Sequence, residues 1–65
     1  MSPEEPTYRV IVYFSDGRAS EYHHVRSYDL DSGGGMTRIT TEVKGKQTIH
    51  FLNNSGVREY RIDVL

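Results

Sequence analysis

One pattern occurs twice in the chain, as VRSYDLD at residues 25–31 and as VREYRID at residues 57–63. Both copies alternate apolar and polar residues and end in an acid, which is typical of a β-strand with one buried face. Each copy follows a pair of strand-like segments joined by a short turn. We therefore expect one unit, a hairpin followed by a third strand, to be present twice within a single small domain. The alternative is that chance or shared strand chemistry explains the match, since it rests on four of seven positions.

The length of 65 residues suffices for one domain. A domain of this size buries only about 60% of its unfolded surface, so it needs disulfides, a metal, oligomerisation or very efficient packing. The sequence has no cysteine, which excludes disulfides, thiolate zinc sites and cysteine nucleophiles. Oligomerisation or tight packing remains, and of these we expect a homodimer.

The domain is expected to span residues 7–65, after a disordered tail at residues 1–6 that holds two prolines and two glutamates. Residues 8–14 alternate as a strand, and both of its faces are largely apolar, which favours a central strand covered on both sides. The dipeptide Asp16-Gly17 predicts a tight hairpin turn, in which these residues adopt positive φ angles.

The return segment, residues 19–24, places Tyr22 on the core side. His23 and His24 then interrupt the apolar alternation, which indicates a bulge or bend where a continuous segment turns a corner. Glycines at positions 33–35 predict a long flexible hairpin loop. Residues 36–43 and 47–52 form a second predicted hairpin, residues 53–56 a corner and residues 57–65 the last strand.

No window shows the apolar spacing of an α-helix. The sequence therefore predicts an all-β fold, an antiparallel meander of five or six short strands. Closure into a small SH3-like barrel is favoured because it protects the strand edges. An open sheet that pairs with a second chain is the alternative.

Catalytic and metal chemistry find little support in the residue pattern. His23, His24 and His50, with Glu21 or Asp16, contain metal-ligating groups, but neighbouring strand residues point to opposite faces, so solvent-facing positions are favoured for all three histidines. The acids lie in turns or on polar strand faces, no serine lies in an elbow motif, and a small domain has little room for a pocket. We predict a protein that is not an enzyme and has no metal or cofactor.

The basic and aromatic residues favour a binding surface. The net charge is −1, unlike that of a duplex-DNA binder, whereas arginine and tyrosine are both enriched at protein interfaces. The same residue types also suit single-stranded nucleic acid, although interleaved acids favour ion pairs across strands. The binding candidates are Arg9, Tyr13, Arg26, Tyr28, Arg58 and Arg61.

The strand alternation over residues 7–65, together with Asp16-Gly17, resembles the short uncharacterised β proteins of actinobacteria and their phages. The resemblance implies an intracellular accessory protein and assigns no catalytic or binding residue. The acidic N-terminus has no apolar signal region, and no apolar run could span a membrane. We therefore expect a cytoplasmic, non-enzymatic protein-interaction module, such as a phage or bacterial modulator of a larger host protein. A single-stranded nucleic-acid binder is the alternative.

Overall fold

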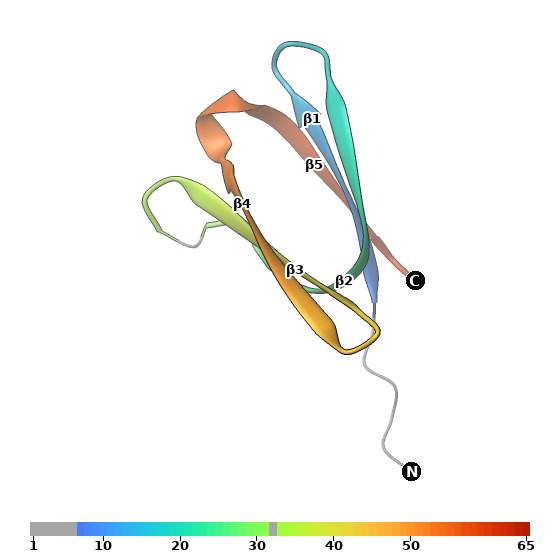
Figure 1. The fold of residues 1–65 in the computed structure, drawn as a ribbon. Coiled ribbons are helices and arrows are strands. Elements are labelled where there is room, and N and C mark those ends of the chain that lie inside the picture. Colours follow the sequence, from blue (N-terminus) through green and yellow to red (C-terminus); the bar gives the residue numbers. More distant parts are fainter. Residues whose placement is uncertain (1–6, 32) are drawn as a thin grey trace.

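The computed structural model describes residues 7–31 and 33–65 and is all-β (Figure 1). The disordered tail predicted at residues 1–6 lies outside the described residues. Five antiparallel strands form one sheet, and a single 3-10 turn precedes the last strand. The elements are β1 (Tyr8–Phe14), β2 (Ala19–Asp29), β3 (Met36–Val43), β4 (Lys46–Asn53), η1 (Asn54–Gly56) and β5 (Val57–Val64).

The strand order is β4-β3-β2-β1-β5, so the first four strands form a meander and β5 returns to pair with β1. This confirms the predicted antiparallel meander. The strands β4 and β5 are the two edges of an open sheet, and the closure into an SH3-like barrel that we expected is not shown. The second predicted unit forms as a hairpin followed by a third strand, whereas the last two segments of the first unit are one strand, β2.

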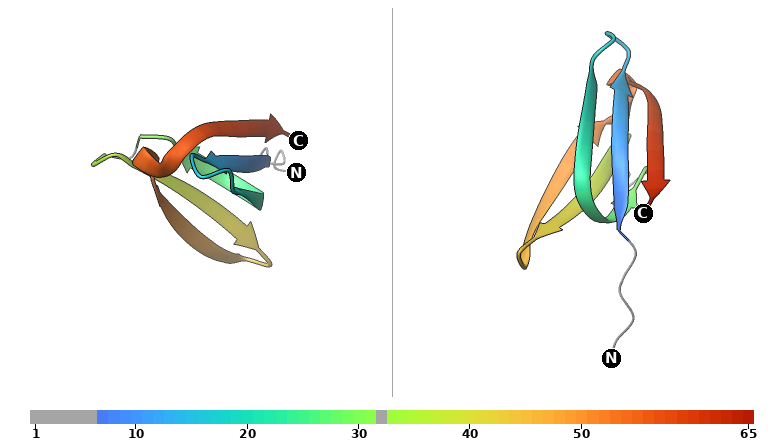
Figure 2. Two further views of the ribbon diagram at one scale, coloured as in Figure 1. Left: turned by 90° about the horizontal axis from the view of Figure 1, so that it is seen from above. Right: turned by 90° about the vertical axis from the view of Figure 1, so that its right-hand side faces the viewer.

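A bulge bends β2 at the position where the two histidines interrupt the apolar pattern. Tyr8 lies opposite Val25 and Val10 opposite Tyr22, so β2 has one extra residue there. His24 adopts a φ angle of 60°, which relieves the mismatch. The predicted bulge is thereby confirmed. It allows the sheet to fold into two halves, with β5, β1 and the start of β2 in one half and β3 and β4 in the other (Figure 2).

The hairpin turn between β1 and β2 differs in detail from the expectation. Only Gly17 adopts a positive φ angle, of 95°, which a glycine accepts without steric cost. Asp16 instead accepts a hydrogen bond from the backbone N–H of Arg18 at 3.0 Å through its side chain. Because this hydrogen bond of the Asp16 side chain closes the turn, the backbone of Asp16 does not have to adopt a positive φ angle.

The core lies on the concave face of the bent sheet, here called the inner face. Its fully buried members are the side chains of Val10, Val12, Val25, Ile39 and Thr37. The predicted inward alternation of β1 is thus confirmed. The expected cover on both faces of β1 is wrong, because Arg9, Ile11 and Tyr13 on the opposite face are only half-buried.

A polar cluster joins the loop after β2 to the turn before β5. The hydroxyl of Tyr60 donates to the hydroxyl oxygen of Thr37 at 2.9 Å. The hydroxyl of Thr37 and the side-chain amide of Asn54 both donate to the carbonyl oxygen of Leu30, at 2.9 and 3.0 Å. These bonds satisfy the buried Thr37 hydroxyl and fix η1 against the start of β3.

Candidate functional site

The structure brings together three of the six predicted binding residues. Arg9 and Tyr13 of β1 and Arg61 of β5 lie on the convex face of the sheet, here called the outer face, because their strand positions alternate with the buried ones. Tyr13 lies opposite Ala19 of β2 on one side and Glu59 of β5 on the other.

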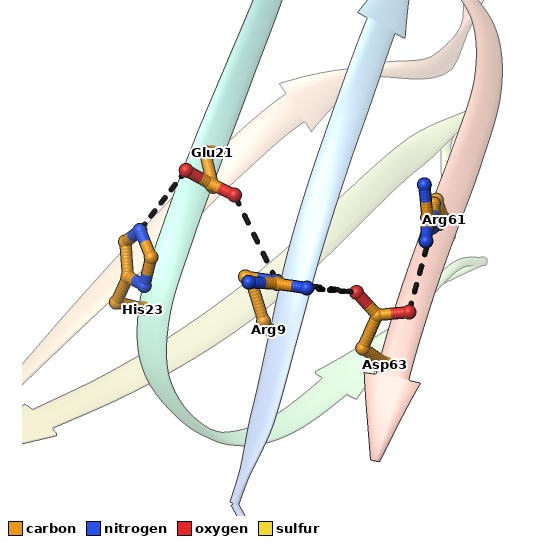
Figure 3. Close-up of polar contacts among 5 residues, drawn as sticks. All are labelled: Arg9, Glu21, His23, Arg61 and Asp63. Carbon is orange, nitrogen blue, oxygen red and sulfur yellow. Dashed lines mark hydrogen bonds and ion pairs between the residues drawn. The ribbon is translucent and has the colours of Figure 1, made fainter. Parts of the chain in front are cut away.

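The outer face of β2, β1 and β5 carries a row in which basic and acidic side chains alternate (Figure 3). His23 lies 3.1 Å from Glu21, and Glu21 lies 3.7 Å from Arg9. Arg9 approaches Asp63 to 2.7 Å, and Arg61 approaches the other oxygen of Asp63 to 3.4 Å. The row thus confirms the expectation that arginines pair with acids across the strands.

The contact between Arg9 and Asp63 shifts the pKa of both groups. The hydrogen bond from Arg9 is the largest cause that lowers the pKa of Asp63 below its ordinary value of 3.8. Burial, the next largest cause, acts in the opposite direction, and the charges of Arg61 and Arg9 add to the lowering. The hydrogen bond to Asp63 raises the pKa of Arg9 in turn. Both groups therefore stay charged and compensate one another, and Arg61 contacts the same carboxylate, so among the described residues of this row neither arginine is a free cation for a phosphate.

The other three predicted residues lie apart from this row. Arg26 follows the bulge of β2 and lies 3.8 Å from Glu42 of β3. Tyr28 packs on the inner side, where its ring meets that of Tyr8 edge to face at 5.2 Å. Arg58 is exposed at the start of β5. The six predicted residues therefore do not form one surface.

The sequence allowed an open sheet with exposed edges but did not show which strands would form them, and the structure shows that β4 is one of these edges. Along β4, Ile49 and Phe51 point to the outer face and keep 53% and 60% of their surface exposed, while His50 and Leu52 lie on the inner face. These two apolar side chains are adjacent on one face of one strand, which is the arrangement that a protein contact buries.

The backbone of β4 alternates between its neighbour and its free edge. The amide of Asn54 donates to the carbonyl of Gly35 at 2.9 Å, in register with the eight residue pairs of β3 and β4. In an antiparallel ladder such bonded pairs alternate with unbonded ones. The backbone groups of Gln47, Ile49, Phe51 and Asn53 therefore face the free edge.

The two edges of the sheet differ in how they are protected. Natural edge strands avoid pairing through bulges, charges or proline. The strand β5 has a bulge, since Tyr13 and Phe14 lie opposite Glu59 and Val57, and it carries four charged residues along its length. In contrast, β4 pairs regularly with β3 throughout and has no proline, lysine, arginine or acid between Gln47 and Asn53.

The histidines lie on different faces. His23 and His24 are exposed, as expected, but His50 is not solvent-facing, because its ring packs against Tyr22 at 4.9 Å between ring centroids. No group of three histidine, aspartate or glutamate side chains that could hold a metal ion, and no pocket, is present within residues 7–31 and 33–65. No helix in this part of the chain has the length and apolar character needed to cross a membrane.

The sequence did carry a signal for the β4 edge. Residues 47–53 form the longest stretch of the last two strands without a lysine, arginine or acid, and such stretches are rare on exposed edges. The uncharged stretch indicates a binding edge only when β4 is known to be an edge strand. Comparison with known proteins found no matching family model, no matching curated protein and no matching solved structure.

Proposed function

We propose that this chain is a non-enzymatic protein-interaction module that binds an extended segment of a larger protein along the free edge of β4. The observation that carries the proposal is the unprotected edge of β4, with Ile49 and Phe51 exposed beside it. A strand added at a sheet edge gains affinity from main-chain hydrogen bonds and specificity from alternate side chains. Here a partner strand would place apolar side chains beside Ile49 and Phe51.

The state of the arginines supports a protein partner over a nucleic acid. Five of the six arginines lie within 4.0 Å of a carboxylate, and Arg58 is the exception among the described residues. A nucleic-acid surface needs cations that can replace the counterions of phosphates, and cations already paired with acids contribute little to this. We therefore retain single-stranded nucleic-acid binding as an outcome of the test.

The proposed cellular location and accessory role are inferred from the sequence. The resemblance to short β proteins of actinobacteria and their phages, together with the absence of cysteine, supports a role as an accessory of a larger bacterial protein in the cytoplasm, where disulfides rarely form. A small module that adds one strand to its target suits such an accessory role.

The test is a pull-down from a bacterial lysate with the tagged wild-type protein and two proline variants. Phe51→Pro removes a backbone N–H that faces the free edge of β4, so the bonds between β3 and β4 remain. Val64→Pro is the matched control on the other edge, because Leu65 donates to Thr7 at 3.1 Å and Val64 therefore faces away from β1. Circular dichroism checks that both variants fold.

Half of each lysate is treated with nuclease. The proposal predicts that a protein is retained by the wild type and by Val64→Pro in both halves, and is lost with Phe51→Pro. Retention by all three proteins would place the binding site elsewhere and overturn the assignment to β4. Loss of the bound material in the nuclease-treated half would favour the nucleic-acid alternative.

A further inference from the structure

We propose that, in the free protein, the edge of β4 is occupied by the β4 strand of a second copy, which runs antiparallel to it and joins the two sheets into one. This inference rests on the proposed function, since it names the occupant of the same edge. A larger partner would then bind by displacing the second copy.

The backbone selects one register for this pairing. The groups that face the edge belong to Gln47, Ile49, Phe51 and Asn53, as shown above. All four residues form backbone hydrogen bonds to the second copy only when Ile49 of one copy lies opposite Phe51 of the other. In this register His50 lies on the two-fold axis. Gln47 then lies opposite Asn53 of the second copy. Four such pairs, each exchanging two hydrogen bonds, give about eight bonds between the copies.

The side chains agree with this register. Residues directly opposite one another in an antiparallel pair point to the same face, so Ile49 of each copy packs beside Phe51 of the other on the outer face. These side chains are the exposed apolar ones of β4, with 53% and 60% of their surface exposed. The pairing therefore buries Ile49 and Phe51 of both copies.

The charges near the two ends of β4 are compatible with a second copy. The two ends of β4 differ, with Lys44 and Lys46 at the turn from β3 and the exposed Asp31 near the other end, where Asn54 donates to the carbonyl of Leu30. Antiparallel pairing brings Lys44 and Lys46 of one copy to the end of the other copy near Asp31, where the exposed Arg58 follows η1. Within the paired stretch neither copy has a lysine, arginine or acid, so no like charges oppose each other.

The small core supplies a reason for the pairing. Among the described residues only four hydrophobic side chains, those of Val10, Val12, Val25 and Ile39, are fully buried. A domain of this size with no cysteine commonly gains its stability from association. The edge of β4 carries two of the exposed large apolar side chains, Ile49 and Phe51, and others lie at the end of β5, at Val64 and Leu65.

Sedimentation of the pure protein tests the association, at a low and at a high concentration. We expect the wild type and Val64→Pro to form dimers with the same dissociation constant and Phe51→Pro to weaken the dimer more than about tenfold. A wild type that stays monomeric, or a dimer that Phe51→Pro leaves unchanged, would overturn the inference.

Disulfide trapping tests the register, because the chain has no cysteine of its own. His50→Cys places one thiol of each copy at the two-fold axis, in an unbonded pair whose Cα atoms are about 4.5 Å apart, a separation that a disulfide can span. Gln47→Cys is the control, since its two thiols would lie on the order of 20 Å apart along the strands. A covalent dimer of His50→Cys alone is expected. Equal trapping of the two variants, or trapping of Gln47→Cys alone, would rule out this register.

The two proposals fail differently. If the wild type sediments as a monomer while Phe51→Pro still abolishes capture from a lysate, the second copy is excluded and the proposed function stands. If the dimer forms as described but the lysate yields no partner at the β4 edge, the pairing stands and the proposed binding of a larger protein does not.

Discussion

Arg9 donates two hydrogen bonds to the same carboxylate oxygen of Asp63, from Nε at 3.1 Å and from Nη2 at 2.7 Å, and thereby ties β1 to β5. The pKa of Asp63 is lowered in the folded protein by this contact. A carboxyl group whose pKa is lower in the folded than in the unfolded protein stabilises the fold at pH values above its unfolded pKa. This contribution is lost as the pH falls through its folded pKa.

We therefore predict that Asp63→Asn is less stable than the wild type at neutral pH, and that the difference disappears as the pH falls below the ordinary value of 3.8. Urea unfolding of both proteins across this range measures the difference. Glu59→Gln, which removes a carboxylate from the same outer face and leaves the contact between Arg9 and Asp63 in place, is the control for the loss of a charge. A gap between wild type and Asp63→Asn that is equally large in acid would show that the ion pair is not its source.

The hydroxyl of Tyr60 and its ring contribute separately to stability. Tyr60→Phe keeps the ring against the core and loses the hydrogen bonds to Thr37 and Asn54, at a cost of about 1 kcal/mol. Tyr60→Ala removes the ring as well and should cost about 3–5 kcal/mol, which is comparable to the whole stability of a small domain. Denaturant unfolding distinguishes the two.

Ile62 packs against the same core from the next inward position of β5. Ile62→Ala should cost about 2–5 kcal/mol, because it leaves a cavity beside Val10, its partner in the register of β1 and β5. Circular dichroism during heating measures the loss. A double variant of Tyr60→Ala and Ile62→Ala that stays soluble and unfolds cooperatively would refute the assignment of this core.

The turn between β1 and β2 depends on Gly17. Its φ angle of 95° lies in a region that side chains with a Cβ atom avoid, so Gly17→Ala should cost about 1–2 kcal/mol although no atom lies near the added methyl group. Gly56→Ala is the control, since this glycine also has open space around it and no positive φ angle. It should change the free energy of unfolding by less than about 0.5 kcal/mol. Equal costs for both would mean that the turn does not require glycine.

The bulge of β2 makes a similar comparison possible at neighbouring positions. His24 has a φ angle of 60°, which is strongly unfavourable for a β-branched residue. His24→Val should therefore be destabilising by about 1–2 kcal/mol, whereas His23→Val, in an ordinary strand conformation, should be nearly neutral. Thermal unfolding compares the two. Similar melting temperatures would place the bulge at another residue.

The strands and turns of this fold could be predicted because their signals are local. Alternation placed Val10 and Val12 on one face, and the interruption at His23 and His24 marked the bulge. The order in which the strands pair depends on contacts between residues that are far apart in the sequence. Whether residues 19–29 form one strand or two depends on how β3 pairs beside them, and only the pairing of β5 with β1 makes β4 an edge.

The candidate site was harder to predict for the same reason. Alternation shows that Ile49 and Phe51 share a face, but the register with β3, in which His50 lies opposite the buried Ile39, decides that this face is exposed. The composition indicated arginine and tyrosine as binding residues. In the structure, most of the arginines are paired with carboxylates and are therefore not free cations. The origin suggested by the resemblance stays a prediction.

Residue-resolved amide hydrogen exchange of β4 tests the central claim, that this edge is the binding site, most directly. The amides of His50 and Leu52 face β3 and should exchange slowly in every sample. Those of Ile49 and Phe51 should exchange rapidly in dilute protein and become protected when a second copy or a captured partner is bound. Rapid exchange of Ile49 and Phe51 in the bound state, with protection on the outer face of β1 and β5 instead, would contradict the claim.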